Sequence, residues 1–188
     1  MMSKPYIALL RGINVGRAKR VAMADLRKLV EELGYDDVRS VLNSGNVVFS
    51  ADGVEPGVAA AAIEEQLVLK LGVAARVTVL SRDELAAVLA ENTLLPVATD
   101  HARLLVFTLA DNAAREAVAP LCERDWGSEA LAIGQRAAYV WCPEGMLQSA
   151  AATALGKQLG DNTTSRNWNT LCKLYALCSE PALAPPGA

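Results

Sequence analysis

The first eighty residues alternate between short apolar runs and longer segments in which apolar residues recur every three or four positions. The short runs are bounded by turn residues and predict strands at 4–12, 37–42, 46–51 and 74–80. The longer segments each end in a glycine and predict helices at 23–34 and 56–72. The resulting order, β-α-β-β-α-β, is that of the split βαβ or ferredoxin-like arrangement, in which two helices cover one face of an antiparallel sheet.

The remaining chain repeats part of this pattern. A helix over 81–95 is expected to bridge to a second unit, which has strands at 102–110, 129–134 and 137–142 and helices at 111–123, 144–160 and 165–178. This half therefore reads as β-α-β-β-α followed by a terminal helix. We see no residue-level repeat that would prove a duplication of the first half.

These elements predict an α+β protein with two ferredoxin-like (split βαβ) subdomains, antiparallel sheets and a C-terminal helix. A length of 188 residues is sufficient for two such small units. The expected division is a first subdomain at 1–80, the bridging helix at 81–95, a second α+β subdomain with the terminal helix at 96–180, and a flexible tail at 181–188.

The composition, with 52% hydrophobic and 21% charged residues, is that of a globular chain with ample core material and excludes a disordered one. A net charge of -3 gives the molecule as a whole no preference for polyanions. No signal peptide and no apolar run of membrane-spanning length are visible, so we expect a cytoplasmic protein without a membrane partner. Its four cysteines are then expected to be reduced and mostly buried.

Charge is unevenly distributed, because residues 1–28 contain seven Lys or Arg against a single Asp. Within this region Arg11 ends the first predicted strand, where a guanidinium offers a bidentate fork for carboxylate or phosphate. Asn14 can donate and accept hydrogen bonds, and the glycines of the loop "GINVG" permit close approach by a ligand. The alternative is structural: Arg11 pairs with an acid and Asn14 caps the turn. The loop matches neither a dinucleotide-binding nor a P-loop motif.

A second polar loop contains Asn43, Ser44 and Asn46, and its sequence "NSGN" is well suited to a hairpin turn. In the split βαβ topology the first and third strands are adjacent and antiparallel. The start of the third strand therefore lies near the end of the first. We expect residues 43–46 to come close to residues 11–14.

The third polar stretch is "TTSRNWNTLCKLYAL", which we read as a helix capped by Thr164 or Ser165. The spacing puts the apolar residues of this helix on one stripe: Trp168, Leu171, Cys172 and Tyr175. Polar residues fall on the opposite side: Arg166, Asn169, Thr170 and Lys173. Arginine in a first turn opposes the helix dipole, and such local conflicts are typical of functional sites. The alternative is a terminal helix with Trp168 as a packing anchor.

Several kinds of chemistry have no support in the sequence. His101, the single histidine, lies in a predicted loop with no nucleophile motif nearby. No cysteine pair has zinc-ligand spacing, and we expect Cys172 to be part of the core. Aromatic residues make up only 5% and show no RNA-binding pattern. The sequence therefore predicts no metal, and leaves catalytic residues and cofactors unknown.

Three motifs together, "ALLRGINVG", "SGNVVF" and "RNWNT…KL", resemble the DUF1697 family of bacterial proteins of unknown function. The resemblance extends from Tyr6 to about Leu177, with the motifs in the family's order. It implies two ferredoxin-like subdomains and brings no established activity. The family usually has a second glycine after "GINVG", where this chain has Arg17.

We therefore expect a small anionic ligand, a nucleotide or a phosphorylated metabolite, at a polar site between the subdomains. Cations from three segments would neutralise its charge and amides and hydroxyls would bind its polar edges: Arg11, Asn14, Asn43, Ser44, Asn46, Arg166, Asn167, Asn169 and Lys173. Three alternatives stay open: a transferase-like enzyme at the same site, a purely structural role for the motifs, and, ranked last, nucleic-acid binding. The chain is expected to be a monomer or a homodimer.

Overall fold

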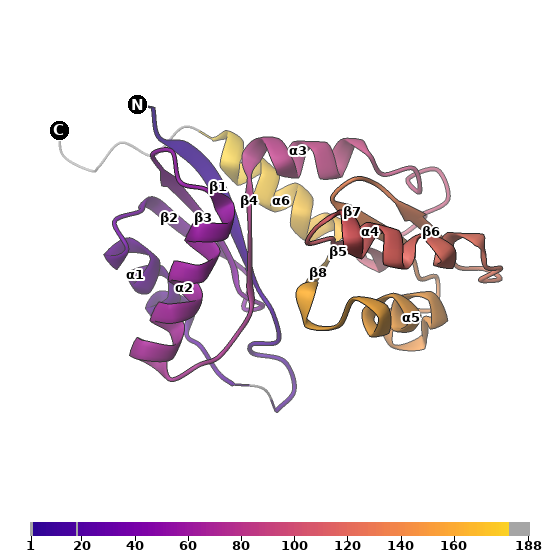
Figure 1. The fold of residues 1–188 in the computed structure, drawn as a ribbon, viewed down its shortest axis with the longest axis horizontal. Helices are drawn as coiled ribbons and strands as arrows, with labels where there is room; N and C mark the ends of the chain where they lie inside the picture. Colours follow the sequence, from indigo (N-terminus) through magenta and orange to yellow (C-terminus); the bar gives the residue numbers. More distant parts are fainter. Residues whose placement is uncertain (1, 18, 181–188) are drawn as a thin grey trace. The chain divides into compact units, whose positions relative to one another are not determined.

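A computed structural model describes residues 2–17 and 19–180 of the chain (Figure 1). The chain divides into two compact units. The first comprises the residues up to Asp83 and those from Lys173 onward, and the second comprises Glu84–Cys172. The terminal helix α6 (Trp168–Ser179) contributes residues to both.

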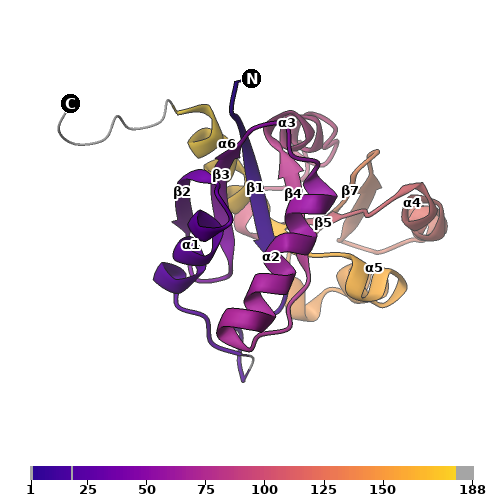
Figure 2. The same ribbon diagram turned by 60° about the vertical axis from the view of Figure 1, so that its left-hand side comes forward.

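The first unit is a four-stranded antiparallel sheet with the strand order β2-β3-β1-β4. Its elements in chain order are β1 (Lys4–Leu10), α1 (Met23–Glu32), β2 (Asp36–Val41), β3 (Asn46–Ala51), α2 (Pro56–Leu71) and β4 (Val77–Ser81). This is the predicted β-α-β-β-α-β order, and β1 and β3 are antiparallel neighbours as expected. Both helices lie on one side of the sheet (Figure 2).

The helices of the first unit are held by apolar residues that recur at helical spacing. Leu26, Leu29, Ile63 and Leu67 are buried in one core together with Phe49 and its strand neighbours. Burial of this kind is the main source of helix stability in a folded protein. It also fixes the end of β1, from which the first polar loop begins.

The second unit has the same topology, with the strand order β6-β7-β5-β8 and all neighbours antiparallel. Its strands are β5 (Leu104–Thr108), β6 (Ala130–Ile133), β7 (Ala137–Trp141) and β8 (Ser165–Asn167), and its helices are α4 (Asn112–Val118) and α5 (Ala150–Leu159). Helix α3 (Arg82–Ala90) follows β4, and four short 3₁₀ helices complete the described elements: His101–Arg103, Ala119–Glu123, Met146–Gln148 and Gly160–Asn162.

The predicted helix at 165–178 is wrong at its start, because residues 165–167 form β8 and the helix begins only at Trp168. Arg166 pairs with Val106 in the register of β5 and β8. Thr164 helps to hold the chain in this register, because its backbone N–H donates to the Thr108 hydroxyl over 3.0 Å. The second unit is therefore β-α-β-β-α-β rather than β-α-β-β-α with a terminal helix.

Two other predicted helices are shorter than expected. The segment 111–123 ends as an α-helix at Val118, and Pro120 lies in the 3₁₀ turn that follows. Proline has no N–H to donate, and its ring crowds the carbonyl four residues earlier, so a regular α-helix does not continue through it. The segment 144–160 begins as α5 only at Ala150, where the Ser149 hydroxyl caps it by accepting from the Ala152 N–H over 2.9 Å.

All four cysteines are free thiols, but only Cys142 and Cys178 are buried. Cys122 and Cys172 are exposed, so the expectation of mostly buried thiols and of a core position for Cys172 was wrong. The buried residues of α6 are Trp168, Thr170, Leu171, Leu174 and Cys178.

Candidate functional site

The two polar loops of the first unit meet at one end of its sheet, as predicted. The backbone N–H of Leu10 donates to the Gly45 carbonyl over 2.8 Å, and the N–H of Arg11 donates to the Arg76 carbonyl over 2.9 Å. The Asn14 side chain donates to the Asn43 carbonyl over 2.8 Å. The loop after β1 is thus connected to the hairpin turn on one side and to the start of β4 on the other.

Asn14 organises the loop through its whole amide group. Its Nδ2 also donates to the Val21 carbonyl over 2.8 Å, and its Oδ1 accepts from the Val21 N–H over 2.8 Å. The backbone of Asn14 is left-handed, with φ of 55°, a conformation that asparagine tolerates better than most residues. Asn14 therefore holds the loop closed, which is the structural role that the sequence left open.

Asn46 and Gly45 have equally local roles in the hairpin. The Asn46 side chain is fully buried, and its Nδ2 donates to the Val41 carbonyl over 2.8 Å and to the Ser44 hydroxyl over 2.9 Å. Gly45 has φ of +85°, and a Cβ placed there would lie 2.7 Å from the Leu10 Cβ. The turn can pack against β1 only because this position has no side chain.

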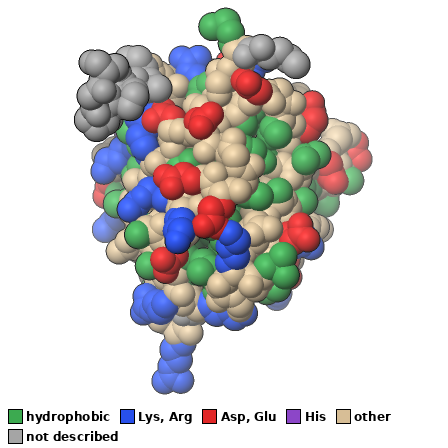
Figure 3. All heavy atoms as spheres, turned by 90° about the vertical axis from the view of Figure 1, so that its left-hand side faces the viewer, with side chains coloured by type: hydrophobic (Ala, Val, Ile, Leu, Met, Phe, Trp, Pro, Cys, Tyr) green, Lys and Arg blue, Asp and Glu red, His purple; other side chains and the backbone are tan. Residues whose placement is uncertain are grey.

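We call the described residues between Arg11 and Arg20 the basic loop. Arg17, Lys19 and Arg20 are exposed on it, and Lys and Arg side chains gather at this lower end of the first unit in Figure 3. The Arg20 guanidinium lies 3.4 Å from the carbonyl of Asn14 and 3.3 Å from that of Gly16. Within the described part of the chain, none of these three cations forms an ion pair with a carboxylate. Their charge is available to an anion from solution.

The third polar stretch is described within the second unit. Arg166 donates to the Thr164 hydroxyl over 3.0 Å and to the Ser165 carbonyl over 2.8 Å. Burial lowers the pKa of the Arg166 guanidinium to about 10, because the charged form has lost much of its hydration. The group still carries a full charge at neutral pH, and a partly dehydrated guanidinium favours an anionic partner.

Asn167 is the N-cap of α6, so the predicted caps Thr164 and Ser165 were wrong. Its Oδ1 accepts from both the N–H and the hydroxyl of Thr170 over 2.9 Å. Thr170 is therefore buried rather than on the polar side of the helix. Arg166 lies outside the helix, which removes the expected conflict with the dipole. Asn169 and Lys173 are exposed, and their joining the basic loop in one site stays a prediction.

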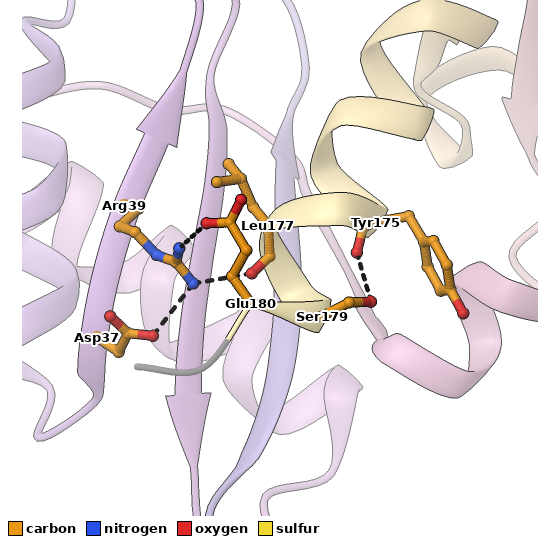
Figure 4. A network of polar contacts seen from close by, with 6 residues as sticks. All are labelled: Asp37, Arg39, Tyr175, Leu177, Ser179 and Glu180. Carbon is orange, nitrogen blue, oxygen red and sulfur yellow. Dashed lines mark hydrogen bonds and ion pairs between the residues drawn. The ribbon is translucent and has the colours of Figure 1, made fainter. Parts of the chain in front are cut away.

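The first unit contains another polar network that the sequence did not suggest. Arg39 of β2 donates to the Leu177 carbonyl over 2.9 Å and pairs with Glu180 and Asp37, each over 3.2 Å (Figure 4). Arg82 contacts the same segment through the hydroxyl of Ser179. These contacts bind the end of α6, and no local pattern could have paired residues so distant along the chain.

The second unit contains a cavity of about 180 Å³, lined by residues that include Trp126, Glu129, Cys142 and Ser149. The Ser149 hydroxyl donates to Glu129, which also accepts from the Ala150 N–H over 3.0 Å. Burial raises the pKa of the Cys142 thiol, which keeps it neutral. Within this lining, the Ser149 hydroxyl and the Glu129 carboxylate thus bond to each other.

No group of three or more His, Cys, Asp or Glu side chains is placed to hold a metal ion within residues 2–17 and 19–180. In the same part of the chain, no helix is both long and apolar enough to span a bilayer.

Comparison with known proteins places the chain in a family. The sequence model of the DUF1697 family, described as proteins of unknown function, matches residues 2–139 of this chain. The chain belongs to this family. Among solved structures, the conserved bacterial protein SP0830 from Streptococcus pneumoniae is similar with a TM-score of 0.77 and 24% sequence identity, over 95% of this chain and 100% of that one. This likeness shows the fold alone. No curated protein matches the chain.

Proposed function

We propose that this protein binds a small anionic ligand, a nucleotide or another phosphorylated metabolite, through the basic loop of its first unit. The observation that carries the proposal is the set of three exposed cations, Arg17, Lys19 and Arg20, on a loop whose base Asn14 connects to Val21 and Asn43. A loop fixed at its base loses less conformational entropy on binding than a free one. The loop contains no histidine and no carboxylate, so we propose binding and assign no reaction to it.

Arginine and lysine side chains at a loop rich in positive φ suit phosphate in particular. Gly12, Asn14 and Gly16 all have left-handed backbones, with φ of 66°, 55° and 55°. Such turns can direct N–H groups outward and form anion-binding concavities. Guanidinium groups add bidentate hydrogen bonds to phosphate oxygens.

The test is titration calorimetry at low salt with sodium tripolyphosphate as the probe. The variant Arg17→Ser/Lys19→Ser removes two cations whose side chains form no hydrogen bond or ion pair within the described residues. The matched control Arg124→Ser/Lys157→Ser removes two exposed cations of the second unit. We expect roughly tenfold or greater weakening in the loop variant, since two charge-assisted hydrogen bonds are lost.

The control variant should bind the probe as the wild type does. Equal weakening in both variants would mean that only net charge matters, and absence of binding by the wild type would refute the proposal. Both variants should unfold at the wild-type urea concentration, because neither substitution removes a buried group.

A further inference from the structure

Two aliphatic side chains are exposed beside the basic loop. Val15 and Leu42 retain 63% and 56% of their accessible surface. Val15 follows Asn14 and Leu42 precedes Asn43, and the hydrogen bond from the Asn14 side chain to the Asn43 carbonyl measures 2.8 Å. The two aliphatic residues therefore lie at the same end of the sheet as the cations Arg17, Lys19 and Arg20.

Leu42 is unusual in its backbone as well as in its exposure. Its φ is 58°, in the left-handed region that asparagine and glycine adopt readily and a bulky residue rarely does. Leaving the isobutyl group in water is also unfavourable. The strained backbone and the exposed side chain of Leu42 together indicate a role at a binding site, because backbone strain is concentrated at ligand-contacting positions.

Asn43 adds a polar group to this apolar surface. Its backbone carbonyl accepts from Asn14, whereas its side chain has no hydrogen bond within the described residues and the residue is exposed. A carboxamide presents a donor and an acceptor side by side, which matches the edge of a nucleobase. Exposed cations, two exposed aliphatic side chains and a carboxamide thus occur together on two connected loops.

We infer that the ligand of the basic loop is a nucleoside phosphate, whose base packs on Val15 and Leu42 while its phosphates contact the cations. This inference rests on the proposed function and narrows it to one ligand class. Inorganic polyphosphates and sugar phosphates have no flat apolar body, so they would gain nothing from the exposed aliphatic residues. A nucleobase does gain, since its flat faces also pack against apolar side chains.

The experiment compares ATP with sodium tripolyphosphate by titration calorimetry, without divalent cations. The variant Leu42→Asn removes the larger of the two exposed aliphatic side chains and suits the left-handed backbone, so it should fold at least as stably as the wild type. The control Leu147→Asn changes a leucine of the second unit that is 95% exposed. Both variants are checked first by urea unfolding.

Wild type and Leu147→Asn should bind ATP roughly tenfold more tightly than tripolyphosphate, a factor that corresponds to about 1.4 kcal/mol from burial of apolar surface. Leu42→Asn should lose this preference and bind tripolyphosphate unchanged. If tripolyphosphate binds and ATP binds no tighter, the nucleoside inference is overturned while the proposed function stands. If neither probe binds, both fail. Binding of phosphatidylserine vesicles that Leu42→Asn abolishes, without ATP binding, would assign the surface to a membrane instead and overturn both.

Discussion

The two units share one strand order but differ in the connection that follows the first strand. In the second unit, residues 109–111 connect β5 to α4, and Asp111 serves directly as the cap by accepting from the Ala114 N–H over 2.8 Å. In the first unit, residues 11–22 connect β1 to α1. Connections in such units need only a few residues.

The comparison shows that the second unit forms the same strand order with a much shorter connection. Part of the longer connection serves the fold, because Ile13 and Val21 are buried in the core of the first unit. The exposed cations Arg17, Lys19 and Arg20 do not contribute to that core. Exposed residues of a long loop on a packed scaffold are a typical location of function.

The largest expected effect is on the hairpin that supports this loop. In Gly45→Ala the new Cβ would meet the Leu10 Cβ at 2.7 Å and the Ile13 Cδ1 at 2.9 Å, on a backbone with φ of +85°. Overpacking and left-handed strain together should lower the free energy of unfolding by about 3 kcal/mol or more. Urea unfolding followed by circular dichroism measures the loss.

Gly127→Ala is the control from the second unit. Its φ is +67°, but no atom lies within 4 Å of the added Cβ, so only the backbone strain of about 1 kcal/mol remains. Equal losses in the two variants would show that crowding against β1 contributes nothing, and that the hairpin does not brace the basic loop.

The first unit uses an asparagine side chain as a donor and the second unit uses one as an acceptor. Substitution by aspartate, which can only accept when ionised, distinguishes the two roles. Asn14 donates through Nδ2 to two carbonyl groups, so Asn14→Asp replaces donors with a charged acceptor and should destabilise by roughly 2–3 kcal/mol. Asn167 contributes only its Oδ1, to Thr170, so Asn167→Asp should be nearly neutral. Urea unfolding measures both.

The third variant of this set is Asn167→Ala. It removes the N-cap side chain of α6 and should lower the free energy of unfolding by about 1 kcal/mol. If Asn167→Asp were as damaging as Asn167→Ala, the oxygen would not be the functional atom of the cap. If Asn14→Asp were neutral, the basic loop would not depend on the two hydrogen bonds that Asn14 Nδ2 donates.

The elements that could be predicted from the sequence are those with their own local signal. The strands of the first unit follow from short apolar runs, and the meeting of residues 11–14 with 43–46 follows from topology once those strands are assigned. The sequence also indicated Asn14 as a possible turn cap. It could not show that one amide reaches both Val21 and Asn43, since that depends on how two loops pack.

The failures concern residues whose structure is decided by distant contacts. The segment Ser165–Asn167 has no apolar alternation, and it becomes a strand because β5 offers it a free edge. That strand delays the start of α6. Cys172 is exposed because the packing of α6, which its spacing alone does not determine, buries Leu171 and Leu174 instead. Arg39 was not singled out because its partners Leu177 and Glu180 lie at the other end of the chain.

The smallest expected effect compares the buried thiols, Cys178 in the first unit and Cys142 in the second. At pH 8 a disulfide reagent should modify the exposed Cys122 and Cys172 faster than the buried pair, which reacts only when the structure opens. Burial raises the pKa of Cys178 to about 11, from an unperturbed value of 9.0. Its contribution to stability is therefore complete below pH 9 and is lost as the pH rises towards 11.

Arg39→Ser sharpens this comparison, because Arg39 binds the Leu177 carbonyl next to Cys178. We expect severalfold faster modification of Cys178 at pH 8, since the end of α6 opens more readily, and an unchanged rate at Cys142. Equal acceleration at both thiols would mean that Arg39 stabilises the whole chain rather than the end of one helix. No acceleration at either would mean that the contacts of Arg82 with Ser179 are sufficient to hold the helix in place.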